Sequence, residues 1–229
     1  MLTALQLIQG VRFVDSFFPS GGFAFSSGLE AAVQHGAVTS EGELSRYLEA
    51  QLRFGLGTRE AVGVARAHAA AAAGIVAPAV ESDWELDSLK IGQSTREASR
   101  QMGRRVLRIA LADGRSPAVL VEYAAALDSS TTPGHVSIVL GLVLGVMGWS
   151  RDQAVAAVLY QAVVGMVSAA LKLLPVGQVG GQRVIEQCLP CIDTMSRSVI
   201  DNQTMTGWTP LHDLFAMQHG SLEHRLFRS

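Results

Sequence analysis

Asp15-Ser-Phe-Phe-Pro-Ser-Gly-Gly-Phe-Ala-Phe-Ser-Ser-Gly-Leu-Glu30 is a joint between two apolar-periodic segments, and the organisation of the chain can be worked out from it. Pro19 fixes its own φ and disfavours helix at the residue before it, so the first helix must end near position 16. Ser20 offers a side-chain oxygen to cap the second helix. Gly21 and Gly22 permit a positive φ or the close approach of another backbone. Pro19, Gly21 and Gly22 are therefore predicted to form a structural turn.

Helical periodicity continues on both sides of this joint, and no period-two run of β-branched residues predicts a strand. Capping boxes are predicted at Ser40 with Glu43 and at Ser94 with Glu97. The segment 75–90 is mixed and predicts a loop with a short helix at 84–89. The other expected helices cover 2–15, 21–35, a stretch after Ser40, 59–73, a stretch after Ser94, 118–128, 136–147, 152–174, 182–199 with a bend or break at Pro190, and 208–219. The glycine-rich run 178–183 is expected to form a second joint between helices. We predict an all-α, single-domain bundle of about nine or ten helices without a sheet.

Two of these helices, 136–147 and 152–174, are apolar nearly all round and are expected at the centre of the fold. The second is almost long enough to span a membrane, but it carries polar residues and is followed at once by Pro175, so we interpret it as a core helix. Its small and polar residues share one stripe, which indicates a close helix contact, the wall of a polar passage or an interface. The stripe consists of Gln161, Gly165, Ser168 and Lys172.

The composition is typical of a protein that binds partners and is found in a reducing compartment. Of the 229 residues, 48% are hydrophobic and 17% charged, which favours exposed apolar surface of the kind found at interfaces. The net charge of −2 gives no general attraction to nucleic acid or to anionic membrane. Two cysteines and the absence of a signal-peptide pattern predict a cytoplasmic protein.

A basic ridge follows the second capping box, with arginines spaced four residues apart and Arg105 beside them. Such a ridge is either a solvated face or a docking element for an acidic protein surface or RNA. The lack of interleaved aromatic residues disfavours nucleic acid. The candidate docking ridge consists of Arg96, Arg100, Arg104 and Arg108.

Catalytic motifs are absent from the sequence, including a P-loop, a Ser-His-Asp order and a dinucleotide fingerprint, so we predict a protein that is not an enzyme. Cys188 and Cys191 form a CxxC with neither a preceding strand nor a second pair, and are interpreted as buried cysteines of a kinked helix. Three histidines near the C-terminus form only a weak candidate for transient metal binding. They are His212, His219 and His224.

Several blocks, in order, resemble the UreF family of urease accessory proteins, and together they cover most of the chain. The CxxC is not part of that pattern. The matching blocks are 15–16, 19–23, 26, 28–30, 89–90, 95–99, 101–105, 134–135, 168–170, 172–178, 181–183 and 225–229.

This resemblance implies an all-helical, non-enzymatic chaperone of urease maturation. It implies that the chain dimerises, binds UreD (also called UreH), recruits the GTPase UreG and coordinates GTP hydrolysis with nickel delivery to apo-urease. No cofactor is implied for this chain, since nickel is handled by the complex. A UreF-like domain at 1–207 would continue into a C-terminal helix and partner-binding tail at 208–229.

The resemblance also implies roles for individual residues. Lys172 and Arg225 would face UreG. The UreD-facing residues would be Trp208, Leu211, Phe215, Leu226 and Phe227.

Two other functions stay open on the sequence. A direct nickel metallochaperone would use Cys188, Cys191 and the C-terminal histidines as ligands. An RNA-associated helical protein would use the arginine ridge and bind with a strong dependence on salt.

Overall fold

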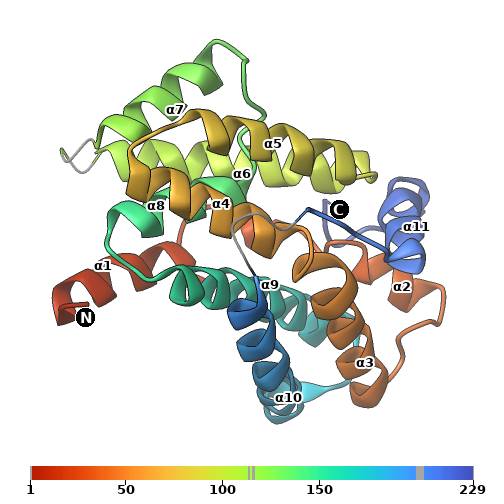
Figure 1. Cartoon of the computed structure of the whole chain (residues 1–229). Helices are drawn as coiled ribbons and strands as arrows, with labels where there is room; N and C mark the ends of the chain where they lie inside the picture. The colour runs from red at the N-terminus through yellow and green to blue at the C-terminus, as the bar shows by residue number, and fades with distance from the viewer. Residues whose placement is uncertain (1, 113, 115–116, 200–203, 229) are drawn as a thin grey trace.

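The computed structural model describes residues 2–112, 114, 117–199 and 204–228. In these residues the chain forms eleven α-helices, three short helical turns and no strand, so the predicted all-α class is confirmed with one helix more than the upper estimate. The α-helices, labelled in Figure 1, are α1 Ala4–Val14, α2 Leu29–Gln34, α3 Glu41–Gln51, α4 Glu60–Ala73, α5 Ala77–Leu89, α6 Gln93–Ala112, α7 Ala118–Asp128, α8 Val136–Val146, α9 Arg151–Leu173, α10 Gly177–Ser198 and α11 Pro210–Gln218. The turns are η1 Gly22–Ala24, η2 Leu52–Leu56 and η3 His219–Ser221.

Helix α8 lies at the centre, packed between α4 and α6, while α9 contacts α4 and α10 (Figure 1). Every residue of α8 from 137 to 144 is buried, as expected for a helix without a polar face. The backbones of α4 and α8 approach so closely that a Cβ at Gly141 would lie 2.6 Å from the carbonyl oxygen of Val64. The prediction of a helix at the centre of the fold is therefore confirmed for α8.

Helix α9 is long and apolar, and its two sides lie in different environments. It is the one helix among the described residues that is long and apolar enough to cross a membrane, and half of its apolar window is buried inside the fold. Ser150 and Gln153 form a complete capping box at its start. One side of α9 thus belongs to the core, and the other contributes to a cavity described below.

Helix α5 corrects the prediction of a loop with a short helix at 75–90, because the helix runs from residue 77 to 89. Its buried face carries polar side chains, above all Asp83, which is fully buried. The Asp83 carboxylate accepts hydrogen bonds from Tyr123 Oη at 2.7 Å, Thr132 Oγ1 at 2.7 Å and the His135 backbone N–H at 3.0 Å. These contacts fix the turn before α8 against α5.

The helix starts were predicted with mixed success. Ser40 caps α3 by accepting from the Glu43 N–H, as expected, although the Glu43 carboxylate bonds to Thr39 instead of completing the box. The prediction of a capping box at Ser94 is wrong, because α6 already begins at Gln93.

The prediction of a glycine-rich joint at 178–183 is also wrong, since this segment lies inside the first turns of α10. Pro190 lies within this helix, which continues to Ser198.

Candidate functional site

The joint between α1 and α2 is tighter than the sequence indicated. Gly21 has φ +82°, and a Cβ there would lie 2.0 Å from Nη1 of Arg105, which donates to the Ser20 carbonyl oxygen at 3.0 Å. The predicted turn at Pro19, Gly21 and Gly22 is thus held against α6. The prediction of a helix from residue 21 is wrong, because the Ser20 hydroxyl caps only the local turn through the Gly22 N–H and α2 begins at residue 29.

A buried glutamate at the start of α2 holds the C-terminal segment in place. Glu30 is fully buried, and its carboxyl group accepts from His219 Nε2 at 2.8 Å and from the backbone N–H groups of Leu226 at 2.6 Å and Phe227 at 3.2 Å. The Arg228 N–H also donates to the carbonyl oxygen of Ala24 at 2.8 Å. We call Glu30 and its three donors the tail latch.

The sequence interpretation did not single out the tail latch. The sequence contains one signal for it, a charged residue between the apolar Leu29 and Ala31. A carboxylate on a buried helix face requires hydrogen-bond donors from elsewhere in the fold. The sequence does not say which donors, since they lie almost two hundred residues further along the chain.

Lys172 and Arg225, predicted to face UreG, are brought to the same region. The Lys172 ammonium lies over the Phe227 ring, 5.2 Å from its centroid, at the end of α9. Arg225 is exposed two residues before Phe227. A cation above an aromatic face is attracted to the ring, so this contact also stabilises the docked tail.

The five residues predicted to contact UreD fall into two sets. Trp208, Leu211 and Leu226 are exposed, with exposed fractions of 77%, 57% and 72%. Phe215 and Phe227 are buried inside the chain, which leaves only the first set accessible on the folded tail. Figure 1 shows α11, which carries Leu211 and Phe215, beside α2.

The arginine ridge does not form one solvated or docking surface. Arg96 donates to the Lys90 carbonyl oxygen at 2.8 Å, Arg100 pairs with Asp87, and both are partly buried. Arg104 and Arg108 are exposed. The N-terminal half of the ridge therefore ties α6 to α5, and docking stays a prediction for the other half.

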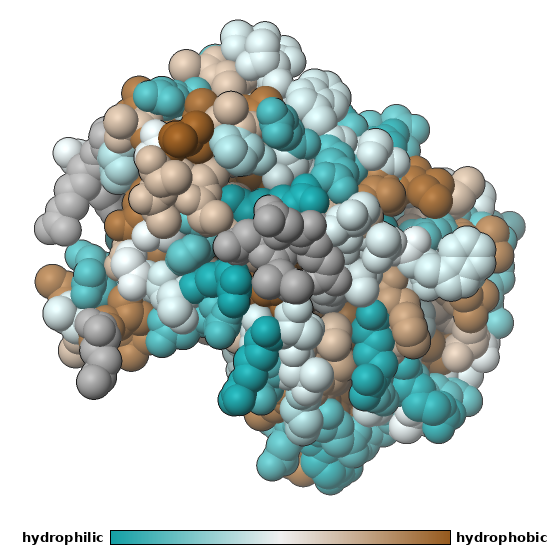
Figure 2. All heavy atoms as spheres, viewed as in Figure 1, coloured by the Kyte–Doolittle hydropathy of each residue, from teal (hydrophilic) through white to brown (hydrophobic). Residues whose placement is uncertain are grey.

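A large cavity of about 810 Å³ runs along α9 and is lined by all four residues of the small and polar stripe: Gln161, Gly165, Ser168 and Lys172. Residues of α1 and α10 also line it, and Figure 2 shows the surface hollowed between these two helices. Gly165, Ser168 and Lys172 are exposed, so this part of the stripe is not in a close helix contact, while Gln161 donates to the carbonyl oxygen of Phe13 in α1 at 3.3 Å. The passage and the interface both stay predictions. At Gly165 a Cβ would meet nothing within 4 Å.

Three buried charges line the same cavity. Glu60 accepts from Lys90 Nζ at 2.5 Å and from Arg59 Nε at 3.2 Å. Burial alone would raise the pKa of Glu60, but the two cations lower it to about 2. Glu60 is thus held between two cations, and Asp213, whose carboxyl pKa is raised by burial, lines the same cavity.

The candidate metal ligands are dispersed. Cys188 and Cys191 are buried on α10, and burial raises the pKa of the Cys188 thiol to about 11, so its thiolate is disfavoured. His219 belongs to the tail latch, while His212 contacts Tyr47 in a separate pocket. The described part of the chain holds no group of three His, Cys, Asp or Glu side chains placed to bind a metal ion.

Comparisons with known proteins agree on one family. The family model UreF matches residues 38–189. The chain is 30% identical over 221 residues to the urease accessory protein UreF of Haemophilus influenzae strain KW20/Rd, covering 96% of this chain and 94% of that one. It is 30% identical over 226 residues to the protein of the same name from Actinobacillus pleuropneumoniae serotype 3, covering 98% and 99%. The relative from Bacillus sp. strain TB-90 is 27% identical over 226 residues, covering 98% and 99%.

The family model lies between the joint and the C-terminal segment, and the three relatives cover 96% or more of this chain. The all-helical fold, the ordered blocks of sequence and the full-length relatives point to the same conclusion. This chain belongs to the UreF family of urease accessory proteins.

Proposed function

We propose that this chain is a non-enzymatic, cytoplasmic scaffold of urease maturation that binds UreD/UreH, recruits the GTPase UreG and couples GTP hydrolysis to nickel insertion into apo-urease. It acts as a homodimer within that complex and binds no cofactor tightly itself. The observation that carries this proposal is the latched C-terminal segment, which displays exposed apolar side chains and Arg225 and packs Phe227 against Lys172 of α9. Exposed apolar groups next to fixed charges are typical of protein interfaces.

The exposed side chains Trp208, Leu211 and Leu226 form the UreD/UreH contact in this proposal. The test is co-purification of the tagged chain with UreD and UreG, comparing wild type with a variant in which all three are alanine. Truncating these exposed side chains leaves the buried Phe215 and Phe227 in place, so the fold is retained. Loss of UreD from a variant with wild-type circular dichroism supports the proposal, and full retention of UreD refutes this contact.

Lys172 and Arg225 form the UreG contact. The double charge reversal Lys172→Glu with Arg225→Glu should release UreG while UreD stays bound. The control is Arg197→Glu, an exposed charge reversal on α10. Equal UreG recovery from the double variant and the control would refute the assignment.

The cavity along α9 is the second part of the proposal: its polar stripe lines a passage for a hydrated metal ion. The supporting observation is that Gln161, Gly165, Ser168 and Lys172 all line the same 810 Å³ cavity. A Ser168→Trp variant should keep both partners and yield urease with less nickel. Nickel content equal to wild type would refute the passage.

A further inference from the structure

The C-terminal segment lines one part of the cavity along α9. The residues that do so are His212, Asp213 and Ala216 of α11 and Phe227 of the tail. Ala98 of α6 lines the same cavity and is buried, and α11 packs against α6. Further along, Ser168 on the exposed side of α9 also lines the cavity. The cavity therefore has one part that is open beside α9 and an inner part that lies under the C-terminal segment.

Two glycines make room for α11 at this inner part. A Cβ at Gly92 would lie 3.2 Å from the Ala216 side chain, and one at Gly28 would lie 3.1 Å from the Ala216 backbone nitrogen. On the same helix, burial raises the pKa of the Asp213 carboxyl, and the charge of the nearby Arg59 opposes that rise. Helix α11 thus rests in a seat shaped by two glycines, with Asp213 turned toward the buried charges of the cavity.

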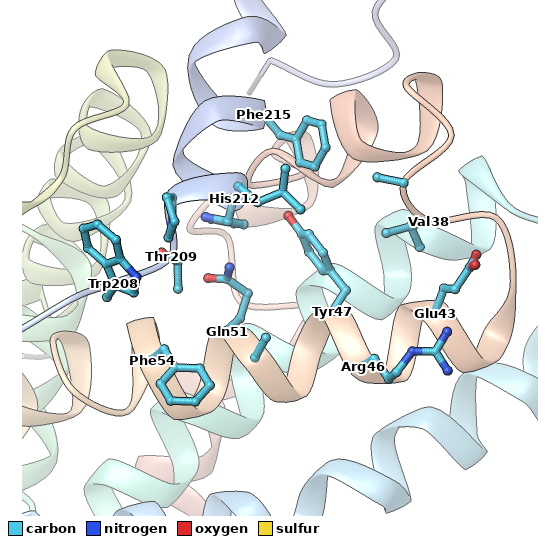
Figure 3. Close-up of a pocket in the computed structure, with 14 residues that line it drawn as sticks. Val38, Glu43, Arg46, Tyr47, Gln51, Phe54, Trp208, Thr209, His212 and Phe215 are labelled. Atoms are coloured by element: carbon cyan, nitrogen blue, oxygen red, sulfur yellow. The ribbon is translucent and has the colours of Figure 1, made fainter.

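The two ends of this segment are attached in different ways. Its N-terminal end is pinned beside η2, because the Thr206 N–H donates to the Thr58 carbonyl oxygen at 3.0 Å and the Trp208 N–H donates to that of Phe54 at 2.8 Å. In Figure 3, Trp208 leads into α11 beside Phe54. The C-terminal end is held by the tail latch and by the contact of Phe227 with α9. Opening the latch therefore frees one end while the other stays pinned, which is the arrangement of a hinge.

The outer side of α11 is apolar and exposed. Leu211, Leu214 and Met217 lie three residues apart and have exposed fractions of 57%, 46% and 59%. Residues at this spacing are neighbours on a helix surface. The same helix thus presents apolar surface to the outside and lines the cavity on the inside, so a partner bound to its outer side acts on the element that covers the cavity.

We propose that residues 210–228 form a hinged lid over the inner part of the cavity along α9. The lid turns about residues 206–208 and is kept closed by the tail latch and by Ala216 in its seat. The closed lid covers Arg59 and Glu60, which line the cavity with exposed fractions of 6% and 7%. This inference rests on the proposed function for the purpose of the lid, which is to control access to the proposed passage. It adds where access is controlled and which contacts control it.

The first test measures access to the inner part. Ala98→Cys places a thiol there, and Ser168→Cys places one in the open part of the same cavity. Iodoacetamide labelling of the full-length chain is followed peptide by peptide with mass spectrometry. Adding Glu30→Ala should speed labelling at position 98 at least about tenfold, because labelling of a covered thiol follows the population of the open state. Labelling at position 168 should keep its rate.

The native Cys188 is the control for the fold. It is buried in α10, outside the lid, and should be labelled equally slowly with and without Glu30→Ala. Faster labelling of Cys188 together with position 98 would show that the whole chain loosens, and would refute a hinged lid. An unchanged rate at position 98 would refute it as well.

The second test locks the lid. The pair Gly92→Cys and Ala216→Cys brings two Cβ atoms to 3.2 Å, close to the spacing of about 3.5–4.5 Å in disulfides. Thr95→Ala accompanies the pair, because the Thr95 hydroxyl would lie 2.8 Å from the new Cβ. In the oxidised, Glu30→Ala chain the lock should return labelling at position 98 to its slow rate. Labelling that stays fast although the disulfide has formed would overturn the lid.

The outcomes separate the lid from the proposed passage. The labelling experiments need no partner and no nickel, whereas the Ser168→Trp variant tests the passage through the nickel content of urease. If labelling changes as expected and Ser168→Trp leaves nickel at the wild-type level, the lid stands and the passage falls. If Ser168→Trp lowers nickel while labelling at position 98 ignores Glu30→Ala, the passage stands and the lid falls.

Discussion

Replacing Glu30 by alanine should release the C-terminal tail without unfolding the helical core. The carboxyl group accepts from three donors, of which His219 Nε2 and the Phe227 N–H are buried and the Leu226 N–H is partly buried. A buried donor left without a partner costs about 1–3 kcal/mol. At roughly 1 kcal/mol for each donor, the docked tail loses about 3 kcal/mol, which raises its undocked population on the order of 100-fold.

Limited trypsin digestion measures this population, because cleavage after Arg225 requires the tail to leave α2. Mass spectrometry should show release of residues 226–229 from Glu30→Ala roughly 100-fold faster than from wild type. Glu122→Ala, an exposed substitution on α7, serves as the control. Glu30→Gln keeps one acceptor oxygen and should give an intermediate rate. If Glu30→Ala and Glu122→Ala release the tail at the same rate, the tail latch does not hold it.

Three further outcomes are expected. Gly103→Ala should lower the free energy of unfolding by about 1–3 kcal/mol in urea denaturation, because its Cβ would lie 2.1 Å from the Gly134 carbonyl oxygen. Gly165→Ala, with open space around it, should raise the free energy of unfolding by up to about 1 kcal/mol. Equal effects of the two substitutions would contradict the packing described for α6. The pKa of Glu60 is lowered to about 2, so its ionised carboxylate contributes about 3 kcal/mol to the free energy of unfolding above pH 4.5, and this contribution is lost as the pH falls toward 2. The difference in the free energy of unfolding between wild type and Glu60→Gln should shrink over that range. A constant difference would refute the lowered pKa of Glu60. Burial raises the pKa of Cys188 to about 11, so iodoacetamide should label it slowly at pH 7.5 until urea unfolds the chain, and rapid labelling of the native chain would contradict its burial.

Local signals in the sequence were sufficient for many helix boundaries. Ser40 caps α3, Gly74 with φ +67° ends α4, and the apolar α8 is buried, because each depends on neighbouring residues alone. Where a helix face is polar, the same reasoning failed. In α5 the buried face includes Ser82 and Asp83, so apolar periodicity is missing, and the groups that donate to Asp83 lie forty or more positions away.

The prediction was wrong where glycines allow close helix packing and do not form a turn. A joint is predicted at 178–183, yet Gly180 and Gly181 lie buried inside α10. A Cβ at Gly180 would lie 2.7 Å from the Glu41 carboxylate of α3, and one at Gly181 would lie 3.1 Å from Val167 of α9. Both glycines therefore allow close helix contact, which the sequence does not distinguish from a flexible loop.

The candidate site was predictable in part. The resemblance predicts roles for Lys172, Arg225 and Trp208, and the structure places Lys172 of α9 against Phe227 of the tail that carries Arg225. The roles of these residues stay predictions. The inward orientation of Phe215 and Phe227 could not be predicted, because an aromatic side chain near a chain end is equally compatible with a core or an interface.

The tail latch has a consequence for the order of events during protein synthesis. Glu30 is translated early, whereas two of its donors lie 196 and 197 residues later. A nascent chain therefore cannot close the latch until residues 226 and 227 have emerged from the ribosome. A partner that recognises the closed tail consequently selects chains whose translation has passed this point, and urease assembly would be shielded from prematurely terminated copies.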